Sequence, residues 1–196
     1  MINITQKNIG IKISGGADSA LVAYLLAKHI IDNGLETKIF PIIIIEEDAP
    51  FQKIFATQVL DIVQGLTNYK FETAQAFLHQ SGTDKIQLMR DIEFSLKNKL
   101  ELIVSGTTQN PKGEFNEPNG PVDNRNGEFP ELWDNWIYTP LINLDKREIA
   151  NLYKEHNLME SLFPYTRSCV AVTKDFTKHC GECWWCKERI YGFGKL

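Results

Sequence analysis

A chain of 196 residues, with 43% hydrophobic and 23% charged residues, has the length and composition of a globular domain that buries a core without disulfides. No apolar run approaches the roughly 20 residues of a membrane span, and the formal net charge of −4 gives no global basis for binding a nucleic-acid backbone. Residues 1–4 lack the basic and apolar regions of a secretory signal. We therefore expect a cytoplasmic protein with neither a membrane nor a nucleic-acid partner.

The first part of the chain alternates strand and helix patterns. Residues 9–13 form a short apolar run, and residues 19–33 place hydrophobic side chains at helical spacing before a glycine. A β-branched run over 37–45 and a second helical pattern over 51–64, which we expect Gly65 to end, repeat this unit. Two strand–helix units therefore follow each other.

The alternation continues into the middle of the chain. A third strand is expected at 69–71, a helix over 84–99 and a fourth strand over 102–105. Strands joined by helical crossovers pair in parallel. The order therefore predicts an α/β fold with a doubly wound, mainly parallel, Rossmann-like sheet.

Regular patterns stop over residues 109–135, where Asn, Gly and Pro dominate. A loop of this length in a compact domain is usually functional, so we expect a substrate lid or an ordered loop. The pattern recovers at 137–141. Asp145 and Glu148 then have the spacing of a capping box, which predicts a helix from Asp145 to about His156.

The segment SGGADS, residues 14–19, lies between the first strand and the first helix and is called the phosphate loop below. Its glycines and the first helical turn allow backbone N–H groups to converge on an anion. The hydroxyls of Ser14 and Ser19 can donate to the same anion, and Asp18 can cap the helix or contact Mg²⁺. The alternative is a tight turn with an N-cap and no ligand, but the strand–loop–helix context favours a phosphate cradle.

All four cysteines lie near the end of the chain, in the pattern C-x10-C-x2-C-x2-C. A Cys-x2-Cys step brings two thiolates close enough to share a tetrahedral Zn²⁺, and four thiolates leave no open position for catalysis. A structural zinc site is expected, with a redox pair or an iron–sulfur cluster as alternatives and His179 as an alternative ligand. The expected ligands are Cys169, Cys180, Cys183 and Cys186.

The phosphate loop resembles the S-G-G-x-D-S loop of the N-type ATP pyrophosphatases, known as PP-loop enzymes. The resemblance implies cleavage of ATP between the α and β phosphates, which leaves an adenylated substrate and pyrophosphate. It also implies that Asp18 and Ser19 are catalytic. The ATP-binding residues that it implies are Ile13, Ser14, Gly15, Gly16, Ala17, Asp18, Ser19, Ala20 and Leu21.

The end of the chain is similar to the zinc segment of the 7-cyano-7-deazaguanine synthases, which reads T-x-S-C, then C-G-x-C-x-x-C-x-x-R, then an aromatic residue. Residues 166–169, residues 180–189 and Phe193 match these three parts. The family's T-P-L segment and following lysine are matched by residues 139–141 and Lys146.

A D-x-R stretch that lies near the substrate in the family is loosely matched by Asp123 and Arg125, so these residues and Lys146 are candidate substrate contacts. The family's Y-G-Q-x-H stretch is absent, and residues 45–48 stand in its place. They include Glu46, Glu47 and Asp48, for which contact with ribose or Mg²⁺ and a solvated turn are both open.

The resemblance implies an ATP-dependent carbon–nitrogen ligase. Such an enzyme adenylates the carboxylate of 7-carboxy-7-deazaguanine and, with ammonia, forms the nitrile, releasing AMP- or ADP-level products and pyrophosphate or phosphate; ATP, Mg²⁺ and Zn²⁺ are its cofactors. We expect an ATP-binding unit over 1–145 and a helical zinc segment over 146–196. A thiolation-type enzyme that modifies tRNA and a non-catalytic nucleotide-binding module are the alternatives, and assembly as a homodimer stays open.

Overall fold

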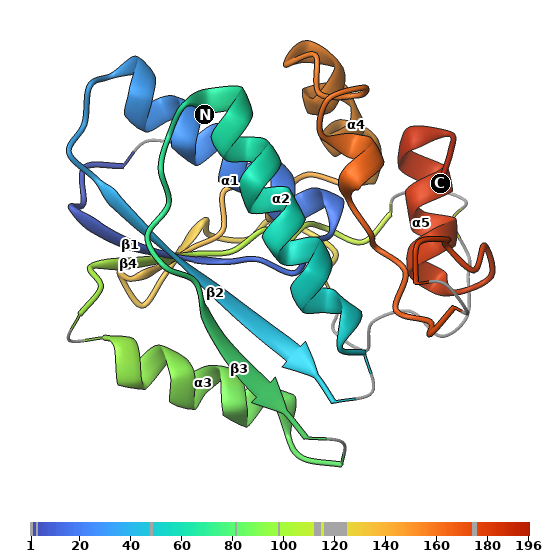
Figure 1. Ribbon diagram of the computed structural model, residues 1–196, viewed down its shortest axis with the longest axis horizontal. Coiled ribbons are helices and arrows are strands. Elements are labelled where there is room, and N and C mark those ends of the chain that lie inside the picture. The colour runs from blue at the N-terminus through green and yellow to red at the C-terminus, as the bar shows by residue number, and fades with distance from the viewer. Residues whose placement is uncertain are drawn as a thin grey trace.

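The structure is built around one β-sheet. The computed structural model describes residues 2, 4–47, 49–80, 82–97, 99–111, 115, 125–173 and 176–196. Within these residues, six strands are arranged in the order β3-β2-β1-β4-β6-β5, with helices on both faces of the sheet (Figure 1). All neighbouring strands are parallel except the last pair, so the predicted doubly wound α/β fold is confirmed.

The centre of the sheet is β1 (Asn8–Lys12), which pairs with β2 (Lys38–Glu46) on one side and β4 (Leu102–Val104) on the other. Ile9 and Ile11 have no exposed surface. A strand that is covered on both faces needs apolar residues along its length, which explains why this run does not alternate with polar residues.

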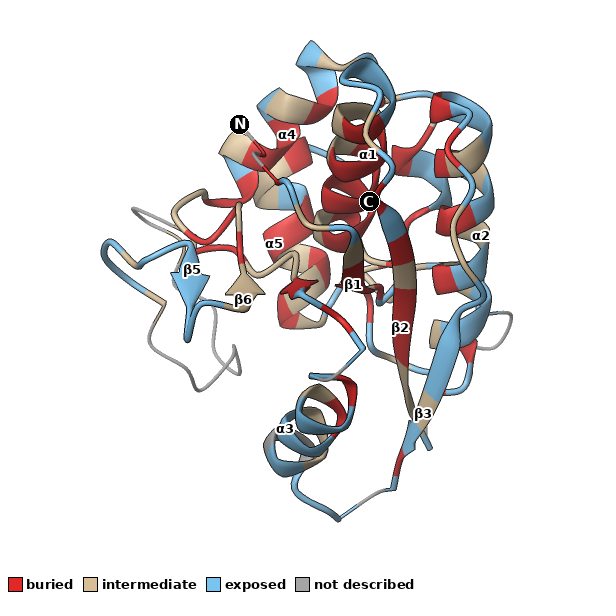
Figure 2. Cartoon of the chain, turned by 90° about the vertical axis from the view of Figure 1, so that its left-hand side faces the viewer, coloured by how far each residue is buried: buried red, intermediate tan, exposed pale blue. Residues whose placement is uncertain are grey.

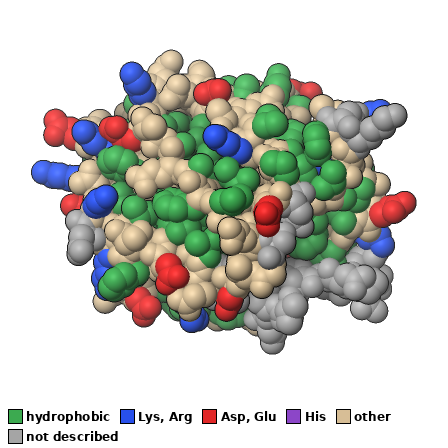
Figure 3. All heavy atoms as spheres, turned by 60° about the horizontal axis from the view of Figure 1, so that its bottom comes forward, with side chains coloured by type: hydrophobic (Ala, Val, Ile, Leu, Met, Phe, Trp, Pro, Cys, Tyr) green, Lys and Arg blue, Asp and Glu red, His purple; other side chains and the backbone are tan. Residues whose placement is uncertain are grey.

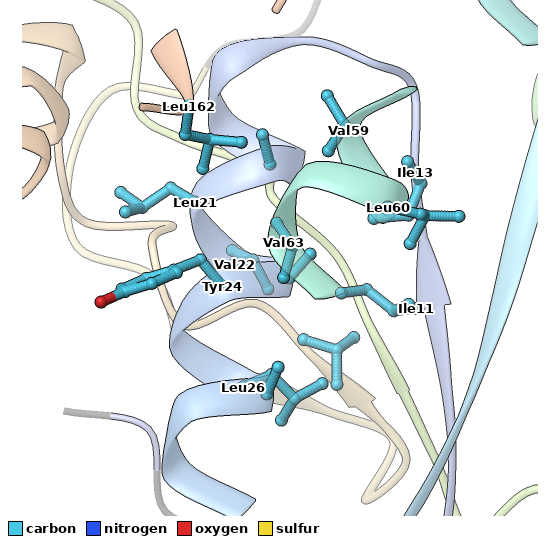
Figure 4. Packing of buried hydrophobic residues seen from close by; sticks show 14 of the residues in the cluster. Ile11, Ile13, Leu21, Val22, Tyr24, Leu26, Val59, Leu60, Val63 and Leu162 are labelled. Atoms are coloured by element: carbon cyan, nitrogen blue, oxygen red, sulfur yellow. The ribbon is translucent and has the colours of Figure 1, made fainter. Parts of the chain in front are cut away.

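Two helices cover one face of the sheet, α1 (Ala17–Asp32) and α2 (Phe51–Thr67). The side chains that interlock there are Ile11, Ile13, Leu21, Val22, Leu26, Val59, Leu60 and Val63 (Figure 4). Figure 2 shows α1 buried over most of its surface, because it lies between the sheet and later helices. It begins two residues before the predicted start, so Asp18 and Ser19 belong to its first turn.

The prediction that Gly65 ends the second helix is wrong. The helix continues to Thr67, whose Oγ1 donates to the carbonyl of Val63 at 2.7 Å, and it ends at Asn68 in the left-handed conformation with φ of 59°. A glycine inside a helix costs only about 1 kcal/mol relative to alanine. Packing of Val63 in the core is sufficient to override that preference.

The prediction of a third strand at 69–71 is also wrong, since β3 spans Gln75–His79. The Tyr69 hydroxyl accepts a hydrogen bond from Ile39 N and donates one to Thr37 O, both at 2.8 Å. The side chain therefore provides hydrogen-bond partners for the backbone at the start of β2. The strand forms later because β3 pairs with the second half of β2, from Ile42 to Glu46.

The chain then crosses to the other side of β1, which places α3 (Lys85–Leu96) on the opposite face of the sheet. A smaller core forms beneath it from Ile42, Ile92 and Ile103. Figure 3 shows the side of the molecule that carries α3 and β3, where hydrophobic side chains gather at the surface; Leu78 and Phe94 are among the exposed ones.

The predicted loop over 109–135 contains a strand near its end. β5 (Leu132–Trp133) runs antiparallel to β6 (Ile137–Tyr138), and the tight turn between them holds Asp134 and Asn135 at φ of 47° and 61°. Asn and Asp adopt this conformation more readily than most residues, which permits a hairpin where the sequence suggested only a loop.

The last part of the chain contains α4 (Lys146–Glu155), the 3₁₀ helix η1 (Phe163–Tyr165) and α5 (Trp184–Phe193). The capping box is confirmed, because the Asp145 carboxylate accepts from Glu148 N while Glu148 Oε2 accepts from Asp145 N. Tyr153, Phe163 and Phe193 share the main core with β1 and α1. The predicted division into an ATP-binding unit over 1–145 and a zinc segment over 146–196 therefore stays a prediction.

Among the described residues, no helix has the length and apolar character to cross a membrane.

Candidate functional site

The phosphate loop joins β1 to α1 at the carboxyl end of the sheet. Gly15 has φ of +80°, and a Cβ there would lie 2.6 Å from Cβ of Phe55, so only glycine fits this turn. Gly16 is the N-cap of α1 and supplies no side-chain cap. The first-turn N–H groups and the positive end of the helix dipole are therefore available to an anion.

Gly106, two residues after the end of β4, allows α1 to approach the strand ends. A Cβ at this position would lie 2.7 Å from Ser19 N and 2.8 Å from the carbonyl carbon of Asp18. The strand order reverses between β1 and β4, and ligands of doubly wound sheets bind at such a switch point. In the sequence, Gly106 is only the residue after the predicted strand over 102–105.

The two serine hydroxyls of the loop lie close together. Ser14 Oγ and Ser19 Oγ are 3.1 Å apart, and Ser19 Oγ donates to Gly16 O at 3.1 Å while it accepts from Ser14 N at 3.3 Å. Ser19 is buried, whereas Ser14 is exposed. Ser19 therefore holds the shape of the loop, and Ser14 presents the accessible hydroxyl.

Three charged side chains meet at the first turn of α1. Lys146 Nζ lies 2.5 Å from Asp18 Oδ2 and 3.2 Å from Glu188 Oε2. Lys146 and Glu188 are almost fully buried, with 3% and 4% of their surfaces exposed. This cluster of Asp18, Lys146 and Glu188 is called the charged triad below.

The charges of the charged triad depend on one another. Burial lowers the pKa of Lys146, but Asp18 and Glu188 outweigh burial and leave the pKa above its ordinary value. Burial also raises the pKa of Glu188, an effect that Lys146 opposes and Asp18 reinforces. Lys146 is therefore held as a cation. A buried ion pair of this kind is strongly sensitive to loss of one partner.

A first cavity of about 370 Å³ opens on the α3 side of the phosphate loop. Its walls include the apolar side chains of Ile42, Ile44 and Met89. At the strand ends it is lined by Ser14 and Thr107. The cavity therefore combines an apolar end with a hydroxyl-rich end beside the anion-binding loop.

A second cavity of about 280 Å³ lies on the other side of the phosphate loop, toward the cysteines. Aromatic rings and cations line it together with both carboxylates of the charged triad. The lining residues outside the loop include Phe51, Phe55, Lys146, Arg167, Trp185 and Glu188. The two cavities share Ser14, Gly16 and Asp18 of the loop and Gln52 of α2, so the loop forms most of their common wall.

The four cysteines converge at the start of α5. Their Sγ atoms all lie within 4.8 Å of one another. The Sγ atoms of Cys180 and Cys186 are 3.8 Å apart, and those of Cys169 and Cys183 are 3.9 Å apart. Four ligands about 2.3 Å from one tetrahedral zinc ion are separated by roughly 3.8 Å. The grouping therefore fits a site in which four thiolates share one metal ion.

Two arginines shape the tail around the cysteines. Arg167 Nη1 donates to the carbonyls of Phe176 and Lys178, both at 2.6 Å, and its backbone N donates to Gly15 O at 2.8 Å. Arg189 is 1% exposed, donates to Thr166 Oγ1 and Phe163 O, and stacks on the Phe163 ring. Burial lowers the pKa of Arg189 to about 10. Arg189 is therefore a structural cation.

The sequence-predicted residues fall into several groups. Ile13, Ala17, Ala20 and Leu21 are buried in the core and shape the loop from behind. Arg125 lines the first cavity, and Lys146 lines the second. Asp123 and Asp48 lie outside the described residues.

Other predicted contacts lie away from both cavities. Glu46 pairs with His79, and Glu47 is exposed at the end of β2, so neither lines the loop cavities. His179 is not one of the grouped ligands among the described residues, and burial lowers its pKa to about 4.

Several cavity residues were missed by sequence reasoning, because a helical pattern classifies them as ordinary surface or core positions. Phe51, Phe55 and Gln52 come from the first turns of α2, and Glu188 comes from α5. The burial of Glu188 is visible only in the structure, so no sequence signal singles it out.

Comparison with known proteins gives a partial match in sequence and a broader one in fold. Residues 131–196 match the model of a family described as queuosine biosynthesis protein QueC, and no curated protein matches the chain. The U34-tRNA thiolase NcsA from Methanococcus maripaludis, solved with its 4Fe–4S cluster, is similar in structure, with a TM-score of 0.51 and 15% identity over 84% of this chain. This chain spans 62% of the thiolase's length.

Two further solved structures from Burkholderia pseudomallei have lower scores. NAD⁺ synthetase matches with a TM-score of 0.42 and 12% identity, over 97% of this chain and 75% of that one. A protein of the universal stress protein family matches with a TM-score of 0.36 and 14% identity, over 54% of this chain and 85% of that one.

Proposed function

We propose that this chain is an enzyme that cleaves ATP between the α and β phosphates, as the resemblance of its phosphate loop to the PP-loop ATP pyrophosphatases implies; the match of residues 131–196 to the QueC family model supports this proposal. The observation that carries this proposal is the common wall of the two cavities, formed by Ser14, Gly16 and Asp18 together with Gln52 of α2. ATP with its phosphates on this wall presents the α-phosphorus to a second reactant in the neighbouring cavity. Holding two reactants in such geometry is itself a large part of catalysis.

The nucleoside of ATP occupies the first cavity in this proposal. Ile42, Ile44 and Met89 suit the faces of adenine, and the Thr107 hydroxyl lies on the side toward the loop. The loop amides and the N-terminus of α1 then hold the β and γ phosphates. These groups neutralise the pyrophosphate as it leaves.

The acceptor occupies the second cavity and is a planar base that carries a carboxylate, 7-carboxy-7-deazaguanine. The half-buried rings of Phe55 and Trp185 offer stacking surfaces. The QueC family match supports this choice, because residues 131–196 contribute Lys146, Arg167 and Trp185 to the cavity.

The reaction proceeds through two activated oxygens. A carboxylate oxygen attacks the α-phosphorus, the bond to the β-phosphate oxygen breaks, and pyrophosphate leaves. Ammonia then attacks the acyl carbon, loses a proton and displaces AMP to give the amide. The amide oxygen then attacks the α-phosphorus of a second ATP and a second pyrophosphate leaves. Loss of AMP and of the two nitrogen-bound protons gives the nitrile. No protein nucleophile is required, so this chain's residues act by binding and orienting.

Asp18 suits Mg²⁺ in this scheme. Its Oδ1 is buried and has no hydrogen-bond partner among the described residues, while Oδ2 is held by Lys146. Carboxylate oxygens are the ligands that Mg²⁺ prefers. When bound, Mg²⁺ would neutralise charge on the phosphates.

The four cysteines would hold one zinc ion, which fits both their number and their spacing. With four thiolates bound, zinc stabilises the fold of the tail and takes no part in the chemistry. The alternative of an iron–sulfur cluster, as the thiolase contains, predicts iron and sulfide in the purified protein.

The test is incubation of the purified protein with ATP, Mg²⁺, ammonium and 7-carboxy-7-deazaguanine, followed by mass spectrometry for AMP, pyrophosphate, amide and nitrile. We expect pyrophosphate and nitrile to appear together and to depend on the base. Pyrophosphate that forms with transfer-RNA and a sulfur donor, but not with the base, would support a thiolation enzyme instead. ATP binding without any turnover would indicate a nucleotide-binding module.

A further inference from the structure

We propose that Glu188 is a positioning residue that couples the cysteine metal site to the phosphate loop, by holding Lys146 against Asp18. Only the expected effect of Glu188 on ATP binding and cleavage rests on the proposed function. The coupling itself is a statement about three side chains from α1, α4 and α5.

A short path of contacts leads from the cysteines to the loop. Cys183 is the N-cap of α5, and Cys186 lies in its first turn, so an ion bound there fixes the start of this helix. Glu188 follows two residues later and reaches Lys146 at 3.2 Å. Lys146 is the first residue of α4 and reaches Asp18 at 2.5 Å.

The backbone packing makes this path stiff. A Cβ at Gly192 would lie 2.5 Å from Lys146 O and 2.8 Å from its carbonyl carbon, so α5 presses directly on the start of α4. Arg189, fully buried beside Glu188, anchors the same helix to Phe163 and Thr166. A shift of α5 therefore moves Lys146, because no space separates the two helices at this point.

The charge balance gives Glu188 a second effect. Two carboxylates face one ammonium, so the charged triad has an excess negative charge next to the loop. That excess offsets part of the charge of a divalent cation that accompanies ATP. Without the Glu188 carboxylate, Lys146 would neutralise Asp18 alone and would have one anchor fewer.

The first test compares Glu188→Gln with the wild-type protein in its metal-loaded form. We expect Mg²⁺–ATP binding, measured by calorimetry, and pyrophosphate release to fall by roughly 10- to 100-fold, as for other groups that orient a ligand-binding residue. Zinc content is expected to stay unchanged. The matched control is Glu160→Gln, since the Glu160 side chain is 89% exposed and lines neither cavity. Wild-type binding and rates in Glu188→Gln would overturn the proposal.

A double-mutant cycle separates positioning from general destabilisation. If both carboxylates act through Lys146, Asp18→Asn and Glu188→Gln combined will weaken Mg²⁺–ATP binding by clearly less than the product of their separate effects. Independent, multiplicative effects would contradict coupling through Lys146. Should Glu188→Gln fail to fold, Glu188→Asp keeps the charge and shortens the reach, and the same cycle is run with it.

Amide hydrogen exchange tests the coupling without nucleotide. The amides of residues 16–20 are expected to exchange faster in Glu188→Gln and in chelator-treated wild-type protein, while the amides of β2 keep their protection. Unchanged exchange at the loop would overturn the coupling. If chelator treatment speeds loop exchange in the wild-type protein but that protein binds no ATP, the proposed function is contradicted and the coupling stands.

Discussion

Lys146 Nζ lies 2.5 Å from Asp18 Oδ2, although 128 residues separate the two in the chain. This contact joins the first turn of α1 to the first residue of α4. It places an ammonium group, buried on all sides, against the one carboxylate of the phosphate loop.

Replacement of Asp18 by Asn is expected to lower pyrophosphate release by about 10²- to 10³-fold, the range for loss of one group that stabilises developing charge. The amide cannot pair with Lys146 as an ion or bind Mg²⁺ with comparable strength. The rate is measured in a coupled pyrophosphate assay. Asp61→Asn on the exposed face of α2 is the matched control. An active Asp18→Asn protein would remove Asp18 from the reaction.

Gly106→Ala is expected to displace the phosphate loop, because Gly106 packs against the residues at the end of that loop. The new Cβ would lie 2.7 Å from Ser19 N, so the start of α1 must move. We expect the free energy of unfolding to fall by about 1–3 kcal/mol. The rate of pyrophosphate release is expected to fall roughly 100-fold, because a displacement of about 1 Å in a catalytic group has an effect of that size.

Gly65→Ala is the matched control for this change. Gly65 lies inside α2 with nothing within 4 Å of the Cβ position. Alanine there should raise the free energy of unfolding by about 0.4–1 kcal/mol and leave the rate unchanged. Urea denaturation of both variants measures the difference. Equal effects of the two substitutions would contradict the close approach at Gly106.

Metal analysis of the purified protein is expected to find one zinc ion per chain and no iron. Cys183→Ser should release the metal and lower the thermal midpoint, because binding energy at such a site contributes to folding. Absorption spectra and sulfide analysis check for a cluster. A metal-free protein with wild-type stability would exclude the stabilising role of the cysteines.

Tyr153 predicts a pH dependence of stability. Its hydroxyl donates to Ala17 O at 2.8 Å, and burial, reinforced by Asp18, raises its pKa well above the ordinary value of 10. The folded-state pKa is therefore higher than the unfolded-state pKa. The stability that this difference contributes is complete below pH 10 and is lost as the pH rises further.

Tyr153→Phe is expected to cost about 1–3 kcal/mol at pH 7, since Ala17 O loses its buried donor. The variant should also show a smaller decline in unfolding free energy above pH 10 than the wild type. Urea titrations at pH 8 and above pH 10 give both values. Parallel pH curves for the two proteins would show that the pKa of Tyr153 is the same in the folded and unfolded states.

The fold was predictable because its signals are local. The apolar run before the phosphate loop and the helix pattern after it identify a strand–loop–helix unit, and the capping box of Asp145 and Glu148 locates α4 to within a residue. The errors at Gly65 and at residues 69–71 arose where tertiary contacts override local preference. Val63 packs in the core, and the Tyr69 hydroxyl is used by the backbone of β2.

The sequence by itself determined the phosphate loop, the group of four cysteines and the alternation of strands and helices up to residue 105, because spacing along the chain is sufficient to place neighbouring groups. Only the tertiary structure decided that Asp18, Lys146 and Glu188 meet, and that the loop divides two cavities. These contacts join α1, α4 and α5 across more than a hundred residues. Their geometry depends on how helices pack around the sheet, and no periodic pattern in one segment records that packing.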